Sequence, residues 1–568
     1  MTTLAQRSAP GGFVVDASAA RTSATRYLCA AAHLNERFTR RVLDEIVYQP
    51  FRAVAPSHGV DVTPVLRHCL AARQRLMARD ATVLLLLLVS AVIAFTLTIT
   101  LFIVLVATVV LTSWARGTRA AQGHQTLVGL GVALAAVLLV LPLTVSVVSG
   151  GLELFDGGSD LGYDESESLS RGTLGGLALL LLALWAVCWA ERVVAHRVIV
   201  EELSPGRFDP TQAPPEPGAL SPRLDYIDRA QWGNVTVYSE LRPHNPFVGS
   251  GSADTPWGFA IPLVPAEVSL NNGRPAPAPL TAAQLYDDMQ AALLSLGDPS
   301  LPPNERVNNL VVEDRVFVAG LLPPDHPALD RRTHSPKAER DAAEVRQLSL
   351  GVRGAVRHYQ SARITSWDGQ VAVTVFAYVA IQGKTLYIEM VPTVLPPILP
   401  LYRSIDGYHR LDGTAVARAG YTALRLLART IVRAPVRLTE ELVGSLRREL
   451  ASARAASDIG SHLAYDYGAT CSVRELGSYA NASLDRLFFQ SLDAHRHIQV
   501  VVERLTDAVQ QTLVRHGYST GELVQQVSNV VNNGVWVGGN VNNSGNLGMG
   551  AGARAGGAPA GAASGRRA

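Results

Sequence analysis

The stretch ATVLLLLLVSAVIAFTLTITLFIVLVATVVLTSWA, residues 81–115, contains no charged side chain and no histidine. A single helix of this length would extend about 52 Å, whereas the hydrocarbon core of a bilayer is about 30 Å thick. Two helices would have about 16 residues each, slightly fewer than a membrane span usually needs. The length of the stretch therefore does not distinguish one long tilted helix from a hairpin of two helices.

Two further blocks, within 126–149 and 174–197, are also rich in apolar residues and almost free of charge. In water, such blocks would need a large core to cover them on all sides. In a bilayer, about 20 apolar residues form a helix that satisfies its own backbone hydrogen bonds. We therefore predict an integral membrane protein with transmembrane helices at 126–149 and 174–197.

The arginines that flank these blocks favour the hairpin for 81–115, because Lys and Arg accumulate at the cytoplasmic ends of spans. With a hairpin, nine flanking basic residues fall on one side and only Arg171 on the other; with one long span the count is five on each side. The nine are Arg67, Arg73, Arg75, Arg79, Arg116, Arg119, Arg192, Arg197 and Arg207.

We therefore predict four α-helical spans, the first two as a tight hairpin, in the cell membrane, with both termini cytoplasmic and an external acidic loop at 150–173. One long span stays the alternative, because residues 95–100 contain no Gly, Pro or Asn on which the chain would turn.

Composition divides the rest of the chain into six further regions. We expect a disordered N-terminus (1–20), a cytoplasmic helical region (21–80), a Pro-rich semi-rigid linker (204–223), a cytoplasmic α+β domain (224–410), a C-terminal helical region (412–530) and an Asn/Gly/Ala-rich low-complexity tail (531–568) that is disordered or self-assembling.

Within the α+β domain the strongest pattern is a three-stranded meander. Its strands are predicted at 355–366, 371–381 and 385–394, with a turn at Asp368-Gly369. The middle strand is apolar on both faces, so we expect a central strand covered by helices on one side. Other strands are expected at 234–240, 257–264 and 311–321, and a capping box at Thr281 and Gln284 begins a helix.

The C-terminal region is expected to hold helices at 415–432, 439–456 and 483–516. The last carries an apolar seam that includes Ile498 and Leu505 and is interrupted by Ser491 and His495. Such a seam either packs inside its own chain or binds a protein partner or a second copy of the chain.

Few residues in the chain support enzymatic, metal or nucleic-acid chemistry. The sequence GKT at 383–385 lacks the preceding glycine of a phosphate loop, and GYSTG at 517–521 follows a helical pattern instead of a strand. The four cysteines form no pair at metal-ligand spacing, and the net charge is only +2. We expect no cofactor, no metal and no nucleic acid partner.

One polar cluster is a candidate ligand site. Backbone amides of the Gly-rich loop that contains Gly249 and Gly251 have the geometry to hold an anion. Side chains that would join them are Arg242, His244, Asn245 and Arg357. The alternative is that these residues bind no ligand: they end a strand, and water hydrates their side chains.

Four passages carry a resemblance. They are RYLCAAAHLNERFTRRVLDEIV (26–47), VAPSHGVDVTPVLRHCLAARQRLMARD (54–80), NVTVYSELRPHNPFVGSG (234–251) and TLYIEMVPTVLPP (385–397). They resemble uncharacterised multipass membrane proteins of high-GC actinobacteria, and the similarity extends to about residue 410. This resemblance implies no activity and no functional residue.

Three functions follow from these patterns. The first is a non-enzymatic integral membrane protein that anchors a cytoplasmic α+β domain, which binds a partner or ligand. The second is a membrane-anchored enzyme with a site near Arg242 and the Gly249–Ser252 loop. The third is a pore or transporter subunit, although the apolar blocks 81–115, 126–149 and 174–190 contain no acidic or basic side chain to coordinate an ion.

Overall fold

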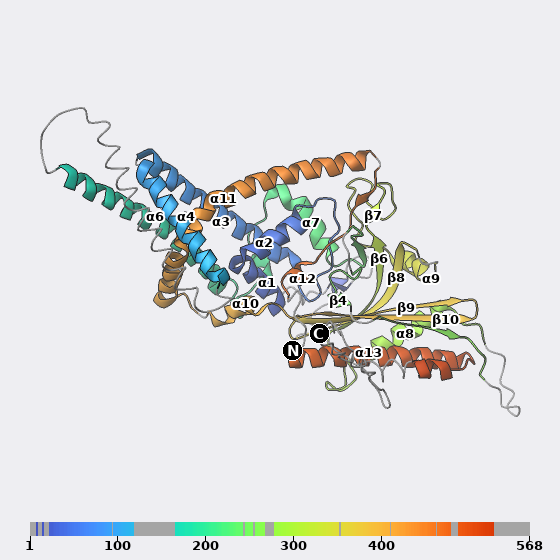
Figure 1. The fold of residues 1–568 in the computed structure, drawn as a ribbon. Coiled ribbons are helices and arrows are strands. Elements are labelled where there is room, and N and C mark those ends of the chain that lie inside the picture. Colours follow the sequence, from blue (N-terminus) through green and yellow to red (C-terminus); the bar gives the residue numbers. More distant parts are fainter. Residues whose placement is uncertain are drawn as a thin grey trace, which may run out of the picture.

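A mixed β-sheet lies at one end of the molecule and a group of apolar helices at the other, in the computed structural model of the chain (Figure 1). The structure describes residues 7–8, 14–15, 22–93, 95–118, 165–241, 245–253, 256–266, 278–351, 354–408, 410–461, 463–478 and 487–526. The predicted span 126–149 and tail 531–568 lie outside these residues, and so does the predicted N-terminus 1–20, apart from the short paired strands β1 (Arg7–Ser8) and β2 (Val14–Val15).

The sheet has seven strands, and the predicted meander forms its centre. The strand order is β3 (Val235–Tyr238), β6 (Leu310–Ala319), β8 (Val356–Ser366), β9 (Val371–Gln382), β10 (Thr385–Leu395) and β4 (Ser252–Ala253), and β5 (Trp257–Pro262) also pairs with β10. β3 runs parallel to β6, and the other pairs are antiparallel. An α+β domain is thus present, as predicted. A separate two-stranded ladder joins β7 (Leu321–Leu322) to β11 (Tyr465–Asp466).

Helices α8 (Ala282–Leu296) and α13 (Phe488–Arg515) cover one face of the sheet, and α9 (Ala342–Leu350) packs beside β8. The capping box at Thr281 and Gln284 begins α8, as predicted. The apolar seam of α13 lies inside the domain, where Ile498 and Leu505 are fully buried against the sheet. Within α13, the predicted seam is therefore covered by the sheet of its own chain and is not a free surface for a partner.

A second core is built from α1 (Ser23–Leu34), α2 (Glu36–Val42), the π-helix η2 (Leu43–Val47), the beginning of α3 (Val62–Ile93) and α7 (Ser221–Ala230). The short helices α10 (Pro400–Arg403), η5 (Ser404–Gly407) and α12 (Val473–Leu476) pack onto it.

The Pro-rich segment 204–223, predicted as a semi-rigid linker, is not extended. Its short helices η3 (Pro210–Gln212) and η4 (Gly218–Leu220) fold back on the helical core, Phe208 packs against that core, and Glu216 pairs with Arg67 at 3.1 Å. Prolines restrict the backbone, but they do not prevent a segment from docking where apolar and charged contacts are available.

The apolar run 81–115 forms two helices, the end of α3 and α4 (Phe95–Thr118). Ser90 Oγ and Thr98 Oγ1 lie 2.8 Å apart. In one straight helix, residues with this separation in sequence would be about 12 Å apart along the axis, so the chain reverses direction between them. α3 and α4 therefore pack as a hairpin.

Two described helices are long and apolar enough to cross a membrane, Val62–Ile93 and Gly175–Glu201. The second lies within α6 (Glu165–Glu201). Because α6 begins at Glu165, residues 165–173 of the predicted acidic loop are helical, and the rest of that loop lies outside the described residues.

The two helices predicted at 415–432 and 439–456 are one helix, α11 (Gly413–Gly460), of 48 residues or about 72 Å. Pro435 lies inside it and supplies no N–H to the preceding turn. The nearby carbonyl of Thr430 accepts a hydrogen bond from the Arg437 guanidinium at 3.4 Å. The first half of α11 packs on α3, α4 and α6, and its last turn reaches the edge of the α+β domain (Figure 1).

Candidate functional site

The densest group of charged side chains lies where the apolar helices meet the rest of the chain. We call it the charge junction. It consists of Glu36, Arg40, Arg73, Arg79, Asp80, Glu191, Arg437, Glu440, Glu441 and Arg448. These residues come from α2, α3, α6 and α11, so four helices that are distant in sequence are joined at one place.

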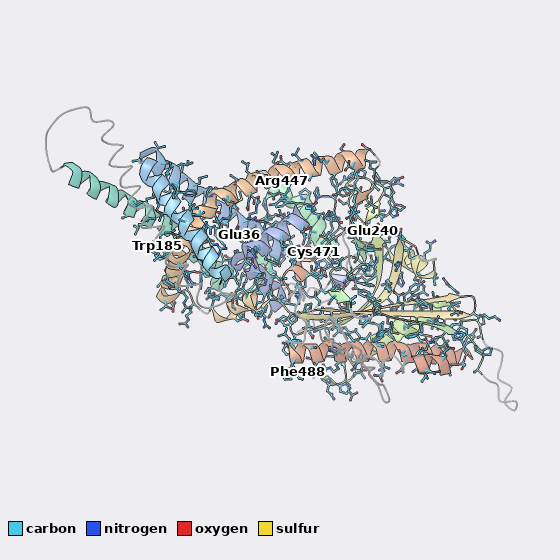
Figure 2. All side chains as sticks on the ribbon, viewed as in Figure 1. Glu36, Trp185, Glu240, Arg447, Cys471 and Phe488 are labelled. Atoms are coloured by element: carbon cyan, nitrogen blue, oxygen red, sulfur yellow. The ribbon has the colours of Figure 1, made fainter. Side chains whose placement is uncertain are left out.

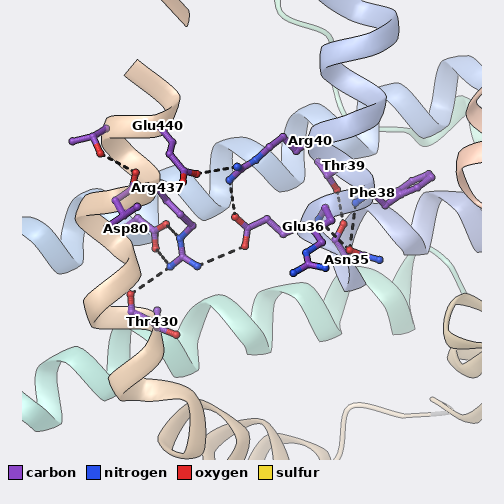
Figure 3. A network of polar contacts seen from close by, with 12 residues as sticks. Asn35, Glu36, Phe38, Thr39, Arg40, Asp80, Thr430, Arg437 and Glu440 are labelled. Atoms are coloured by element: carbon purple, nitrogen blue, oxygen red, sulfur yellow. Dashed lines mark hydrogen bonds and ion pairs between the residues drawn. The ribbon is translucent and has the colours of Figure 1, made fainter. Parts of the chain in front are cut away.

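Asp80 is the last charged residue before the apolar run, and its side chain is only 4% exposed. Arg437 of α11 holds it through two bonds, Nε to Oδ2 at 2.6 Å and Nη2 to Oδ1 at 3.0 Å. Arg437 also lies 3.6 Å from Glu36, and Arg40 connects Glu36 with Glu440 (Figure 3). A buried carboxylate with a bidentate guanidinium is a geometrically specific contact.

A second arm of the junction is centred on Glu441 of α11. Its carboxylate pairs with Arg73 and, at 2.7 Å, with Arg448. Burial raises the pKa of Glu441, but the hydrogen bonds from the two arginines outweigh this, so the net pKa is below its ordinary value. Tyr48 accepts a hydrogen bond from Arg73 at 2.6 Å, and the Arg448 guanidinium lies 4.5 Å from the centre of its ring.

The third arm reaches α6 and two histidines. Glu191 pairs with Arg75 at 3.3 Å and with Arg79 at 3.5 Å. Arg75 also lies 3.1 Å from Nδ1 of His33, which therefore accepts, so the proton of His33 is on Nε2 and is directed at His68. Burial, followed by His68 and Arg75, holds the pKa of His33 well below its ordinary value.

The cavity beside the junction has a volume of about 50 Å³ and is lined by Glu36, Asp44, Tyr48, Arg73, Asp80, Arg437 and Glu441, among others. This volume holds a few water molecules and is far below the space that an organic ligand needs. Acidic and basic side chains already neutralise one another there. The arrangement is thus suited to locking helices together and not to chemistry on a substrate.

The Gly-rich loop predicted as an anion site does meet a carboxylate, but it belongs to the same chain. The amides of Gly249 and Gly251 donate to Oε1 of Glu475, at 2.8 and 3.3 Å. Both glycines have positive φ, and a Cβ on Gly249 would lie 2.1 Å from the Pro56 carbonyl oxygen. The loop amides are thus occupied from within, and the expected external ligand has no place at them.

Ser250 in the same loop contacts a histidine, but in the wrong arrangement for a nucleophile. His58 Nε2 lies 3.2 Å from Ser250 Oγ, and Arg363 donates to His58 Nδ1 at 2.8 Å. Since Nδ1 accepts, the histidine proton is on Nε2 and points to the serine, so His58 does not act as a base toward it. All three residues are buried.

Of the other predicted site residues, the structure describes Asn245 and Arg357. Arg242 and His244 lie outside the described residues. Asn245 Nδ2 donates to the Gly251 carbonyl at 2.5 Å and braces the loop. Arg357 is exposed on β8, opposite Phe317 of β6.

Sequence reasoning did not find the charge junction. In the sequence, Arg73 and Arg79 are flanking charges of a predicted span, Asp80 marks where the apolar run begins, and Arg437 belongs to no motif. The available signal was a carboxylate directly before 35 uncharged residues, because a charge at the edge of a membrane usually has a partner.

A family model described as an AbeC-like domain matches residues 256–543, more than half of the chain, which includes α11 and the centre of the sheet. No curated protein matches, and no solved structure matches.

Proposed function

The chain belongs to the AbeC-like domain family, and from this premise we propose that it is a non-enzymatic, multipass membrane protein whose cytoplasmic α+β domain binds a protein partner. The observation that carries this proposal is the charge junction. It connects Asp80, and through Arg79 also Glu191, to α11, which continues to the α+β domain. Asp80 and Glu191 border the apolar stretches of α3 and α6. Because these contacts join the α+β domain firmly to the spans, a movement of the spans would also move the domain.

The proposed topology has four spans with both termini cytoplasmic, as the arginine count favours. Residues 81–93 of α3 extend about 20 Å, which is less than the hydrocarbon thickness. Two arrangements of the hairpin are therefore compatible with this length. Either the hairpin crosses the bilayer and part of the charge junction lies below the headgroups, or the hairpin enters the bilayer partway and returns to the same side. In both cases the residues before 81 and after 118 lie on the same side.

The first half of α11 fits a position at the membrane surface. Tyr421 and Leu424 are exposed there, together with Arg418, Arg425 and Arg433. Exposed apolar side chains beside arginines are typical of a helix that lies in the interface, with its guanidinium groups at the headgroups.

The proposed partner surface is the N-terminal end of α13. The seam of this helix is buried, but Phe488, Phe489 and Leu492 at its beginning are exposed (Figure 2 labels Phe488). A group of exposed large apolar side chains is typical of a protein contact. The enzyme alternative is less well supported, because the amides of the Gly249–Ser252 loop bind the carboxylate of Glu475. The pore alternative is also less well supported, because Thr98, one of the threonines that would line a pore, is hydrogen-bonded to Ser90 inside the hairpin.

Two experiments test the two parts of this proposal. Membranes that contain the full chain are washed with alkaline carbonate, and we expect the protein to stay in the pellet; release into the supernatant contradicts the anchoring. A photo-crosslinking residue at Phe489 is expected to yield an adduct in cells, with the exposed Arg504 of the same helix as the matched control position. Equal adducts from both positions contradict the partner surface.

A further inference from the structure

The second half of α11 carries an apolar seam with the spacing of a coiled coil. In a seven-residue repeat, Val436, Val443 and Leu450 occupy the first core position, a, and Thr439, Leu446 and Ala453 occupy the fourth, d. All six are exposed, and the two leucines and two valines are between 43% and 57% exposed. Leu442 beside them is 71% exposed.

This seam points away from the protein's own chain. At 3.6 residues per turn, Arg437, Glu441 and Arg448 lie on the opposite side of α11, and these are the residues that bind α3 and η2. Figure 2 shows Arg447 on this stretch, along a border of the molecule. Because the ion pairs on one side of α11 hold it against α3 and η2, the apolar seam on the other side faces away from these helices.

We propose that this face of α11 pairs with the same face of a second copy of the chain as a parallel two-stranded coiled coil. β-Branched side chains at a with Leu at d favour two parallel strands, and Val443 with Leu446 has this pattern. Glu449 and Arg454 occupy the flanking g and e positions, five residues apart, where a parallel pair brings g of one helix to e of the other. Both are exposed, and neither forms an ion pair within the described residues.

The parallel orientation rests on the proposed function. Two copies anchored in one membrane with the same topology are related by an axis along the membrane normal, so stretches of helix that run along this normal have the same direction in both copies. The proposed pair therefore places the second half of α11, beyond Pro435, along the normal, whereas the first half lies at the membrane surface. The stretch of α11 that would pair follows the part of α11 that packs on α3 and α6, and it leads to the α+β domain (Figure 1). Dimerisation would therefore bring two α+β domains side by side.

The test uses the full chain in membranes and an oxidant that forms disulfides. Leu446→Cys, at a core position, is expected to give roughly tenfold more disulfide-linked dimer than Ala451→Cys, which is exposed on the same helix outside the seam, because only the core pair comes within bonding distance. In the Leu446→Cys background, Glu449→Arg is expected to reduce the dimer, and adding Arg454→Glu is expected to restore it.

Equal crosslinking of Leu446→Cys and Ala451→Cys overturns the proposal, and so does a product whose mass is not that of two chains. Failure of the double charge reversal to restore the dimer overturns the parallel arrangement. Carbonate extraction of the same samples separates this from the proposed function. A chain that stays in the pellet without crosslinking contradicts only the dimer, and a chain that crosslinks but is extracted contradicts only the anchoring.

Discussion

Asp80 and Arg437 lie 357 positions apart in the sequence, and the Arg437 guanidinium donates to both oxygens of the Asp80 carboxylate. This contact connects the last charged residue before the apolar hairpin to the turn of α11 that follows Pro435. Because both partners are largely shielded from water, the contact is specific for these two residues and costly to break on one side only.

We expect Asp80→Asn to reduce the free energy of unfolding by about 3 kcal/mol or more, because it leaves Arg79 and Arg437 without their buried carboxylate. Denaturant titration of the full chain in detergent measures this change. The matched control is Glu201→Gln, which removes an exposed ion pair with Arg197 on α6. A much smaller loss is expected for the control, because its two side chains are exposed to water. Equal losses from both variants would show that the Asp80 pair is no stronger than a surface pair.

The hairpin between α3 and α4 predicts a specific crosslink. Ser90→Cys/Thr98→Cys is expected to form an intramolecular disulfide, because the two hydroxyl oxygens are 2.8 Å apart. The control is Thr82→Cys/Ser90→Cys, with the same sequence separation inside α3, where the side chains lie about 12 Å apart along the axis. Mass spectrometry detects the disulfide. Its absence from the first pair, with the protein intact, contradicts the hairpin.

The carboxylate of Glu475 acts as an internal ligand of the Gly249 and Gly251 amides. We expect Glu475→Ala to destabilise the chain by about 1–3 kcal/mol, because it leaves buried donors without an acceptor. Added formate supplies the missing carboxylate and is expected to raise the melting temperature of the variant, but not of the unmodified chain at the same ionic strength. Equal responses of the two proteins, or no response of either, would show that the loop holds no anion.

The fold of the sheet was predictable from local patterns, and the site was not. The strands β8, β9 and β10 match the predicted meander within one residue at each end, because the Asp368-Gly369 turn and β-branched residues are local signals. The α13 seam was recognisable as apolar, but its sequence does not say which surface covers it. α11 continues through Pro435 because tertiary contacts on both sides of the proline hold the helix together. The charge junction and the Glu475 contact join residues hundreds of positions apart, and no local pattern encodes such pairs.

Two histidines with lowered pKa values predict a decline in stability on acidification. Burial, and then the neighbouring Arg363, lower the pKa of His58 well below its ordinary value, and His33 is lowered in the same direction. A group whose pKa is lower in the folded state stabilises the fold above its unfolded value, near 6.5, and loses this contribution as the pH falls toward the folded value. Each such histidine is expected to contribute a slope of at most about 1.4 kcal/mol per pH unit below about pH 6.5.

His58→Asn keeps an acceptor near the position of Nδ1 and does not titrate. The variant is expected to show a shallower loss of melting temperature between pH 6.5 and 5 than the unmodified chain. Thermal unfolding in detergent over this range measures the slope. An unchanged slope in His58→Asn would contradict the assignment of the decline to this residue.

The proposed topology is tested most directly by finding on which side of the membrane the chain lies before and after the hairpin. Reporter fusions after residues 80, 97, 120, 160 and 200 are compared in intact cells. We predict cytoplasmic signals at 80, 120 and 200 and an external signal at 160; at 97 the signal is external if the hairpin crosses completely. Opposite signals at 80 and 120 would contradict the hairpin topology, because they require residues 81–115 to cross the membrane once.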